Sequence, residues 1–68
     1  MKVEKFISQS MTYEVGDFYE GYEDTDVIKF LNIEDHKLVI TTTYDHFLPI
    51  KAGDWAKFPD GTSLTFED

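Results

Sequence analysis

The chain has 68 residues, with 14 acidic against 6 basic side chains, a net charge of -8 and no cysteine. A chain of this length forms one small domain, and without cysteine it has neither a disulfide nor a thiolate metal site. Negative charge of this size opposes binding to nucleic acid or to an anionic membrane, because those contacts require clustered basic side chains. It favours a basic partner. We therefore expect a single small domain, residues 1–68, that does not bind nucleic acid directly.

Neither end of the chain suggests membrane insertion. No apolar run approaches the roughly 20 residues that a spanning helix needs. The N-terminus contains Glu4 and has no long apolar region, so it does not have the pattern of a signal peptide. We expect a soluble, cytoplasmic protein.

The first third of the chain is predicted to be extended. Residues 2–8 have the composition of a strand with imperfect alternation. Gly16 and Gly21 interrupt the following segment and disfavour a helix. A turn at Gly16 between two short extended pieces, 13–15 and 18–20, is one interpretation. A long ordered loop is the other.

Residues 25–32 are predicted to form the one helix. The apolar residues of VIKFL recur at helical spacing, and Asp24, Thr25 and Asp26 before them are residues that cap helix N-termini. A competing interpretation makes the same residues a strand that pairs through Glu34 and Asp35 with the next one. The β-branched Val27 and Ile28 support this alternative.

The last part of the chain is predicted to consist of strands and turns. Residues 36–43 alternate as a strand, 44–46 turn, 47–50 return, and 51–54 turn again. Residues 55–66 form a hairpin about the Pro-Asp-Gly sequence ending at Gly61. Together, the predicted elements indicate an α+β fold: a small, mostly antiparallel sheet of four to five strands with one short helix. The alternative is a small all-β barrel.

Charge and aromatic residues concentrate in one segment, about residues 13–26, which we treat as an insertion in the single domain. It holds six of the acidic residues, several aromatic residues and no basic residue. Such a segment either folds its aromatic residues onto a small core or presents acids and aromatic anchors to a partner. The candidate partner-binding residues are Glu14, Asp17, Tyr19, Glu20, Tyr22, Glu23, Asp24 and Asp26.

Four short motifs carry a resemblance. Val3-Glu4, Phe30-Leu31, Ile40-Thr41-Thr42 and Gly53-Asp54-Trp55 occur in this order before the final hairpin. The chain in this respect resembles a loose family of small bacteriophage-encoded proteins of unknown function. The resemblance covers residues 2–8 and 26–66, so residues 10–23 are an insertion relative to it, and that family's usual continuation after the hairpin is missing.

The resemblance implies an α+β fold and a phage origin, and it implies no catalytic residue. With the charge pattern it predicts a non-enzymatic inhibitor of a host protein, such as a defence nuclease or another nucleic-acid enzyme. Its acidic surface would imitate DNA, an anti-defence strategy. Two alternatives stay open: a homo-oligomeric virion or assembly protein that associates through residues 38–44, and a protein that sequesters a nucleotide or other small molecule between subunits.

Other candidate sites are weaker. The two Asp-His pairs at residues 35–36 and 45–46 lack a third ligand and the spacing of a metal site. No Gly-rich phosphate loop or nucleophile motif is present, and a chain this short forms a catalytic cleft only with difficulty. We expect no cofactor, metal or catalytic residue. Trp55 is expected to cover the core.

Overall fold

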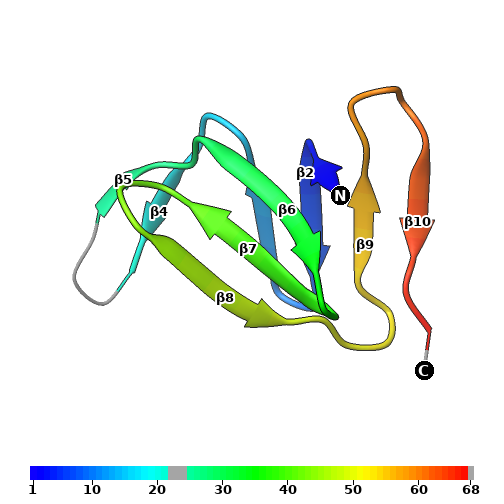
Figure 1. Ribbon diagram of the computed structural model, residues 1–68. Helices are drawn as coiled ribbons and strands as arrows, with labels where there is room; N and C mark the ends of the chain where they lie inside the picture. Colours follow the sequence, from blue (N-terminus) through cyan, green and yellow to red (C-terminus); the bar gives the residue numbers. More distant parts are fainter. Residues whose placement is uncertain (22–24, 68) are drawn as a thin grey trace.

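The structure is a computed structural model that describes residues 1–21 and 25–67 (Figure 1). Ten strands make up its regular secondary structure. They are β1 (Lys2–Val3), β2 (Lys5–Ser8), β3 (Met11–Glu14), β4 (Phe18–Glu20), β5 (Thr25–Val27), β6 (Phe30–Glu34), β7 (Lys37–Thr41), β8 (Asp45–Pro49), β9 (Trp55–Lys57) and β10 (Ser63–Thr65).

The strands form three antiparallel sheets. Sheet A has the order β1-β6-β7-β8, and sheet B has the order β10-β9-β2-β3. The hairpin of β4 and β5, here called the flap, forms a small sheet of its own at one end of the molecule (Figure 1). The N-terminal segment joins the two large sheets. Its first part, β1, pairs with β6 in sheet A, and its second part, β2, pairs with β3 and β9 in sheet B. The predicted strand at 2–8 is thus two strands divided at Glu4.

The core lies between sheets A and B. Its fully buried members come from strands of both sheets and from the residue after the flap: Val3, Phe6, Ile28, Leu31, Leu38, Ile40 and Ala56. Burial of a core this small offsets the ordering entropy of the chain only narrowly. Half-buried aromatic side chains extend it, and the ring of Phe66 lies 6.0 Å from that of Phe6.

The α+β prediction is wrong, since no helix occurs in residues 1–21 and 25–67. The alternative of a small all-β fold agrees in part with the three sheets. Residues 25–32 comprise β5, the connecting residues Ile28 and Lys29, and the first part of β6. One additional residue in the connection gives this sequence the spacing of a helix. Ile28 and Leu31 are both buried, while Lys29 between them is exposed and donates its N–H to Thr41 O at 2.8 Å. The additional residue changes the strand periodicity from two to three, as in a β-bulge.

The competing strand interpretation of this region is confirmed in part, since β6 pairs with the strand that follows whereas β5 pairs with β4. β6 and β7 pair from Phe30 opposite Thr41 to Glu34 opposite Lys37. Asp35 and His36 connect them with φ values of 49° and 60°. Two successive positive φ values define the tight turn whose twist matches that of a strand pair.

Most predictions for the second half are confirmed. The expected strand at 36–43 is β7, with Leu38 and Ile40 on the core face. The predicted hairpin at 55–66 is β9 and β10, and Gly61 adopts φ 93° in the turn. β7 lies between β6 and β8, so its backbone is paired on both sides. The predicted contact run 38–44 thus lies mostly in an interior strand of sheet A.

Among the described residues, none belongs to a helix of the length and apolarity that crossing a bilayer requires.

Candidate binding surface on the flap

Strand alternation gives the flap two faces. Phe18 lies opposite Val27, Tyr19 opposite Asp26 and Glu20 opposite Thr25. Side chains that are directly opposite share a face of an antiparallel pair. Tyr19 and Asp26 therefore lie on the inner face, and the other two pairs lie on the outer face.

The inner face docks the flap onto the rest of the molecule through aromatic rings. The ring of Tyr19 lies 4.7 Å from that of His46 on β8 and 6.1 Å from that of Tyr13 on β3. Burial raises the pKa of the Tyr13 phenol, and the neighbouring Tyr19 raises it further. Tyr19 is thus half-buried and holds the flap in place.

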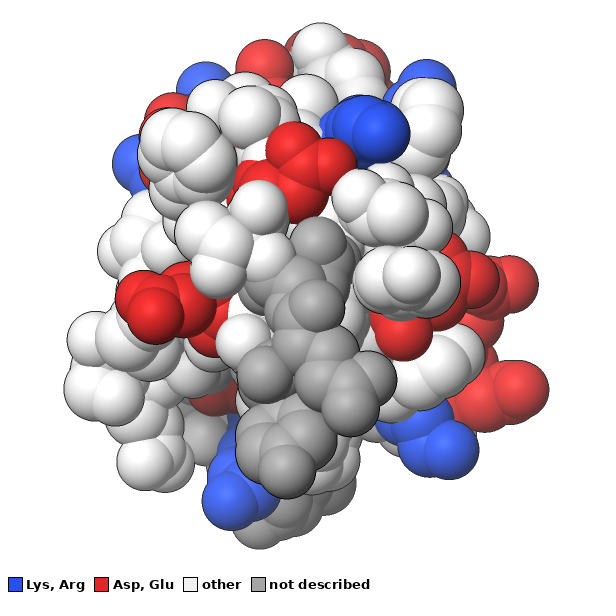
Figure 2. Space-filling model, turned by 90° about the vertical axis from the view of Figure 1, so that its left-hand side faces the viewer, with Lys and Arg blue, Asp and Glu red and all other residues white. Residues whose placement is uncertain are grey.

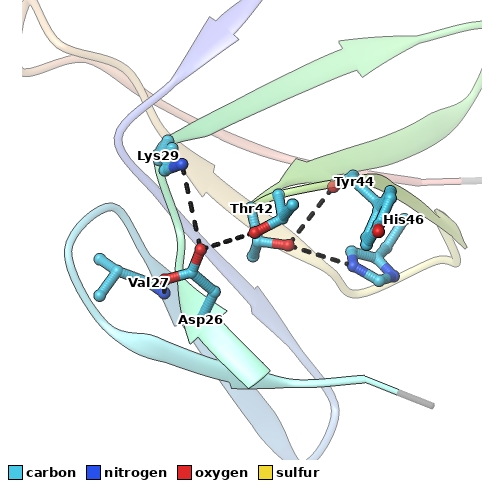
Figure 3. A network of polar contacts seen from close by, with 7 residues as sticks. Asp26, Val27, Lys29, Thr42, Tyr44 and His46 are labelled. Atoms are coloured by element: carbon cyan, nitrogen blue, oxygen red, sulfur yellow. Dashed lines mark hydrogen bonds and ion pairs between the residues drawn. The ribbon is translucent and has the colours of Figure 1, made fainter. Parts of the chain in front are cut away.

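Asp26 forms the polar part of the same contact (Figure 3). Its Oδ1 accepts a hydrogen bond from the N–H of Val27 at 2.7 Å, and its Oδ2 accepts one from Thr43 Oγ1 at 2.8 Å. Lys29 Nζ lies 3.9 Å from the same Oδ2. Asp26 therefore joins the flap to the turn between β7 and β8.

That turn is itself held by a buried hydroxyl. Thr42 is 3 % exposed, its Oγ1 lies 3.2 Å from His46 Nε2, and its N–H donates to Tyr44 O at 3.0 Å. Figure 3 shows His46 beside this threonine and the Asp26 contacts next to it. Thr42 and His46 thus fix the surface on which the flap rests.

The outer face presents apolar surface bordered by acids. Phe18 is 77 % exposed and Val27 opposite it is 36 % exposed. Glu20 is exposed on the same face, and Asp17, which precedes Phe18 in the chain, is also exposed. An aromatic side chain this accessible is poorly covered by its own chain, and it is the kind of residue that anchors protein interfaces.

Charge on this end of the molecule is mixed but mainly negative. Figure 2 views the end that carries the flap, where carboxylates are spread over the face and lysines lie nearer its margins. Between described residues, the ion pairs are Lys29 with Asp26 and Lys57 with Glu4. Asp17 and Glu20 belong to neither pair, so their charges face solvent.

The predicted binding residues divide into separate groups. Glu20 lies on the outer face of the flap, whereas Tyr19 and Asp26 lie on its inner face. Asp17 is exposed where β4 begins, and its C=O accepts the N–H of Ile28. Glu14 lies apart from them, half-buried in a groove of about 490 Å³ that also has Lys2 and Lys29 in its lining. Tyr22, Glu23 and Asp24 lie outside the described residues. Asp26 caps no helix, so that prediction is wrong.

Phe18 is not among the partner-binding residues predicted from the sequence. The signal was present in the tripeptide Phe18-Tyr19-Glu20, because alternate residues of a strand point to opposite faces. Only one of the two neighbouring aromatic rings therefore packs inward. The sequence does not say which, and the structure places Tyr19 inside.

The two histidines do not form a joint site. His36 lies at the turn before β7, opposite Ile50, and His46 lies near the other end of the same hairpin, opposite Ile40. In residues 1–21 and 25–67 no group of three or more histidine, aspartate or glutamate side chains is placed to hold a metal ion.

Asp54 is the buried carboxylate of the structure. It is 2 % exposed, and its Oδ2 accepts a hydrogen bond from the N–H of Lys51 at 2.9 Å. Its Oδ1 has no hydrogen-bond partner among the described residues and is sealed from solvent. Asp54 thus closes the turn between β8 and β9, as expected for the Gly-Asp-Trp motif, and presents no accessible oxygen to a ligand.

Comparisons with known proteins show no significant similarity of this chain to a protein family, a curated protein or a solved structure.

Proposed function

We propose that this protein is a non-enzymatic binding protein whose flap attaches to a basic surface of another protein. The observation that carries the proposal is the exposed pair of Phe18 and Val27, with the exposed acid Glu20 on the same face and exposed Asp17 next to Phe18 in the chain. Apolar area at the centre of an interface supplies most of the affinity. Surrounding charges speed encounter and select the partner.

The proposed partner is a host protein with a nucleic-acid-binding surface, encountered in the cytoplasm of a bacterial cell. The net charge of -8 matches the basic groove of such a protein. The phage origin implied by the resemblance suggests inhibition of a defence or nucleic-acid enzyme by occupation of that groove. In this proposal Phe18 is the main anchor, and Asp17 and Glu20 are the principal charges.

A pull-down from bacterial lysate tests the proposal. One bait is the wild-type chain, and a second carries Asp17→Asn, Phe18→Ser and Glu20→Gln. A third carries Glu34→Gln, Asp35→Asn and Glu67→Gln. This control removes three exposed acids that lie outside the flap, and asparagine tolerates the positive φ of residue 35.

We expect the wild type and the control to recover the same partner and the flap variant to lose it. Recovery should fall as salt is raised from about 0.05 M to about 0.3 M, because the Debye length shortens across this range. Equal recovery by all three baits would show that the flap is not the binding surface.

A further inference from the structure

β8 has an open edge. Two backbone hydrogen bonds at the ends of the β7–β8 pair fix which residues of β8 face β7. The N–H of Ile50 donates to His36 O at 3.2 Å, and the N–H of Thr42 donates to Tyr44 O at 3.0 Å. Hydrogen-bonded and non-hydrogen-bonded pairs alternate along an antiparallel ladder. The residues directed at β7 are therefore those at positions 44, 46, 48 and 50. The N–H and C=O groups of Asp45 and Phe47, and the C=O of Pro49, point away from the sheet.

These outward groups have no backbone partner among the described residues, and β8 is the last strand of sheet A (Figure 1). An unpaired strand edge is a template for another extended chain. The side chain of Phe47 is 65 % exposed on the outer face of sheet A, opposite Val39. The edge therefore offers both backbone hydrogen bonds and apolar contact.

We infer that β8 accepts a basic extended segment of a partner protein as an added antiparallel strand. Strand addition to an open sheet edge is a common mode of peptide recognition, in which the backbone supplies affinity and alternate side chains supply specificity. The inference rests on the proposed function only for the charge of the partner. It adds a second surface, separate from the outer face of the flap.

Charge argues for a basic occupant. Asp45 is exposed at the start of the edge, with Oδ1 2.8 Å from Thr41 Oγ1, and β8 contains no lysine. A cation in the added strand would lie opposite Asp45 or over the ring of Phe47. The same sheet face already shows the second type of contact, since Lys2 Nζ lies 5.6 Å from the centre of the Phe30 ring.

A second copy of this chain fits the edge less well. Two β8 strands paired about Phe47 would place each Asp45 opposite the partner copy's Pro49, which has no N–H to donate. Each copy also carries a net charge of -8, which opposes association. A lysine-bearing segment encounters neither obstacle.

The inward side of the added strand also finds room. At the Pro49 end of the edge lies a cavity of about 150 Å³. Its lining includes Leu48, the serines at positions 8 and 10, and the charged residues Lys51 and Asp54. Small apolar residues on the inward face of the segment would contact Leu48 there. The preferred segment thus alternates basic and small apolar residues.

A peptide of about seven residues that alternates lysine and valine is the test ligand, a length typical of one strand. Lysines opposite Asp45 and Phe47 must use their N–H groups to pair with β8, whereas the valine N–H groups face solvent. Methylating the lysine backbone nitrogens should therefore weaken binding at least about tenfold. Methylating the valine nitrogens should leave it unchanged, and replacing lysine with glutamate should abolish it. Equal binding by the two methylated peptides would overturn the inference.

The matched protein variants are Phe47→Pro and Phe47→Ala. Proline removes the outward N–H without removing a bond to β7, and β8 already holds proline at the equivalent position 49. We expect Phe47→Pro to weaken binding more than Phe47→Ala, by about tenfold or more. Equal weakening would count against strand addition. If Phe47→Pro does not fold, the methylated peptides decide the question.

The flap variant from the pull-down keeps this inference separate from the proposed function. If strand addition is correct, the flap variant binds the peptide within about threefold of wild type. Loss of peptide binding in the flap variant but not in Phe47→Pro would overturn strand addition and leave the flap proposal standing. Sedimentation of the wild type tests whether a second copy of this chain occupies the β8 edge. A wild-type dimer that Phe47→Pro dissociates would show that it does, and would overturn the inference that the occupant is a basic segment of another protein.

Discussion

Tyr19 rests on His46 with their ring centroids 4.7 Å apart, and this contact attaches the flap to β8. No described residue of the flap belongs to the fully buried core, and the nearest core residue, Ile28, follows the flap in the chain. Its position therefore depends on a few contacts of its inner face. The two surfaces proposed for binding, the outer face of the flap and the edge of β8, are consequently joined by one aromatic pair.

Tyr19→Ala should loosen the flap without unfolding the domain. Aromatic pairs contribute about 0.5–1.5 kcal/mol beyond the area that they bury. We expect faster hydrogen exchange at the N–H of Ile28, which bonds to Asp17 O at 2.8 Å, and little change in the amides of β7. Tyr19→Phe keeps the ring and is the control. Uniform acceleration of exchange throughout the chain would show that the flap does not open independently.

Asp26→Ala should cost about 1 kcal/mol of stability. The carboxylate accepts hydrogen bonds from Val27 and Thr43, and partial exposure reduces what such bonds contribute. Glu20→Ala removes an acid of the same hairpin whose carboxylate has no hydrogen bond or ion pair among the described residues, and it should change stability by less than about 0.5 kcal/mol. Urea unfolding measures both. Equal effects would mean that Asp26 acts only through its charge.

Leu38→Ala should cost about 3 kcal/mol, because Leu38 is fully buried between the sheets and truncation leaves a cavity. A domain of this size can be largely unfolded by such a loss. Leu64→Ala, at a side chain that is 44 % exposed, should cost far less. Thermal unfolding compares the two variants, and similar melting temperatures would contradict the core that we describe.

Asp60→Ala should show a pH-dependent effect. Hydrogen bonds from the hydroxyl and the N–H of Thr62, at 2.6 and 2.9 Å, lower the pKa of the Asp60 carboxyl below its usual range. A lowered folded-state pKa stabilises the protein above the unfolded-state pKa, about 3.9, and this contribution is lost as the pH falls through the folded-state value. The variant should therefore be less stable than wild type at pH 7, and the difference should shrink in acid. Urea unfolding midpoints of the wild type and the variant, measured at pH 7 and in acid, test this expectation. A difference that grew on acidification would contradict it.

The sequence by itself determined the elements whose signals are local. The β-branched, apolar run around Leu38 and Ile40 favours a strand, and the turn at Gly61 requires a residue that tolerates positive φ. The acidic character of residues 13–26 follows from composition alone. Phe18 and Tyr19 also had to lie on opposite faces of any strand that contained both.

Only the tertiary structure decided the rest. The inserted residue Lys29 made the pattern around Ile28 and Leu31 helical, and pairing with β7 overrode that local signal. Tyr19 became a docking residue and Phe18 an exposed one because His46, distant in the sequence, packs against just one face of the flap. The open edge of β8 likewise depends on which strand ends sheet A. Strand order is set by contacts between residues far apart in the chain, which local periodicity does not encode.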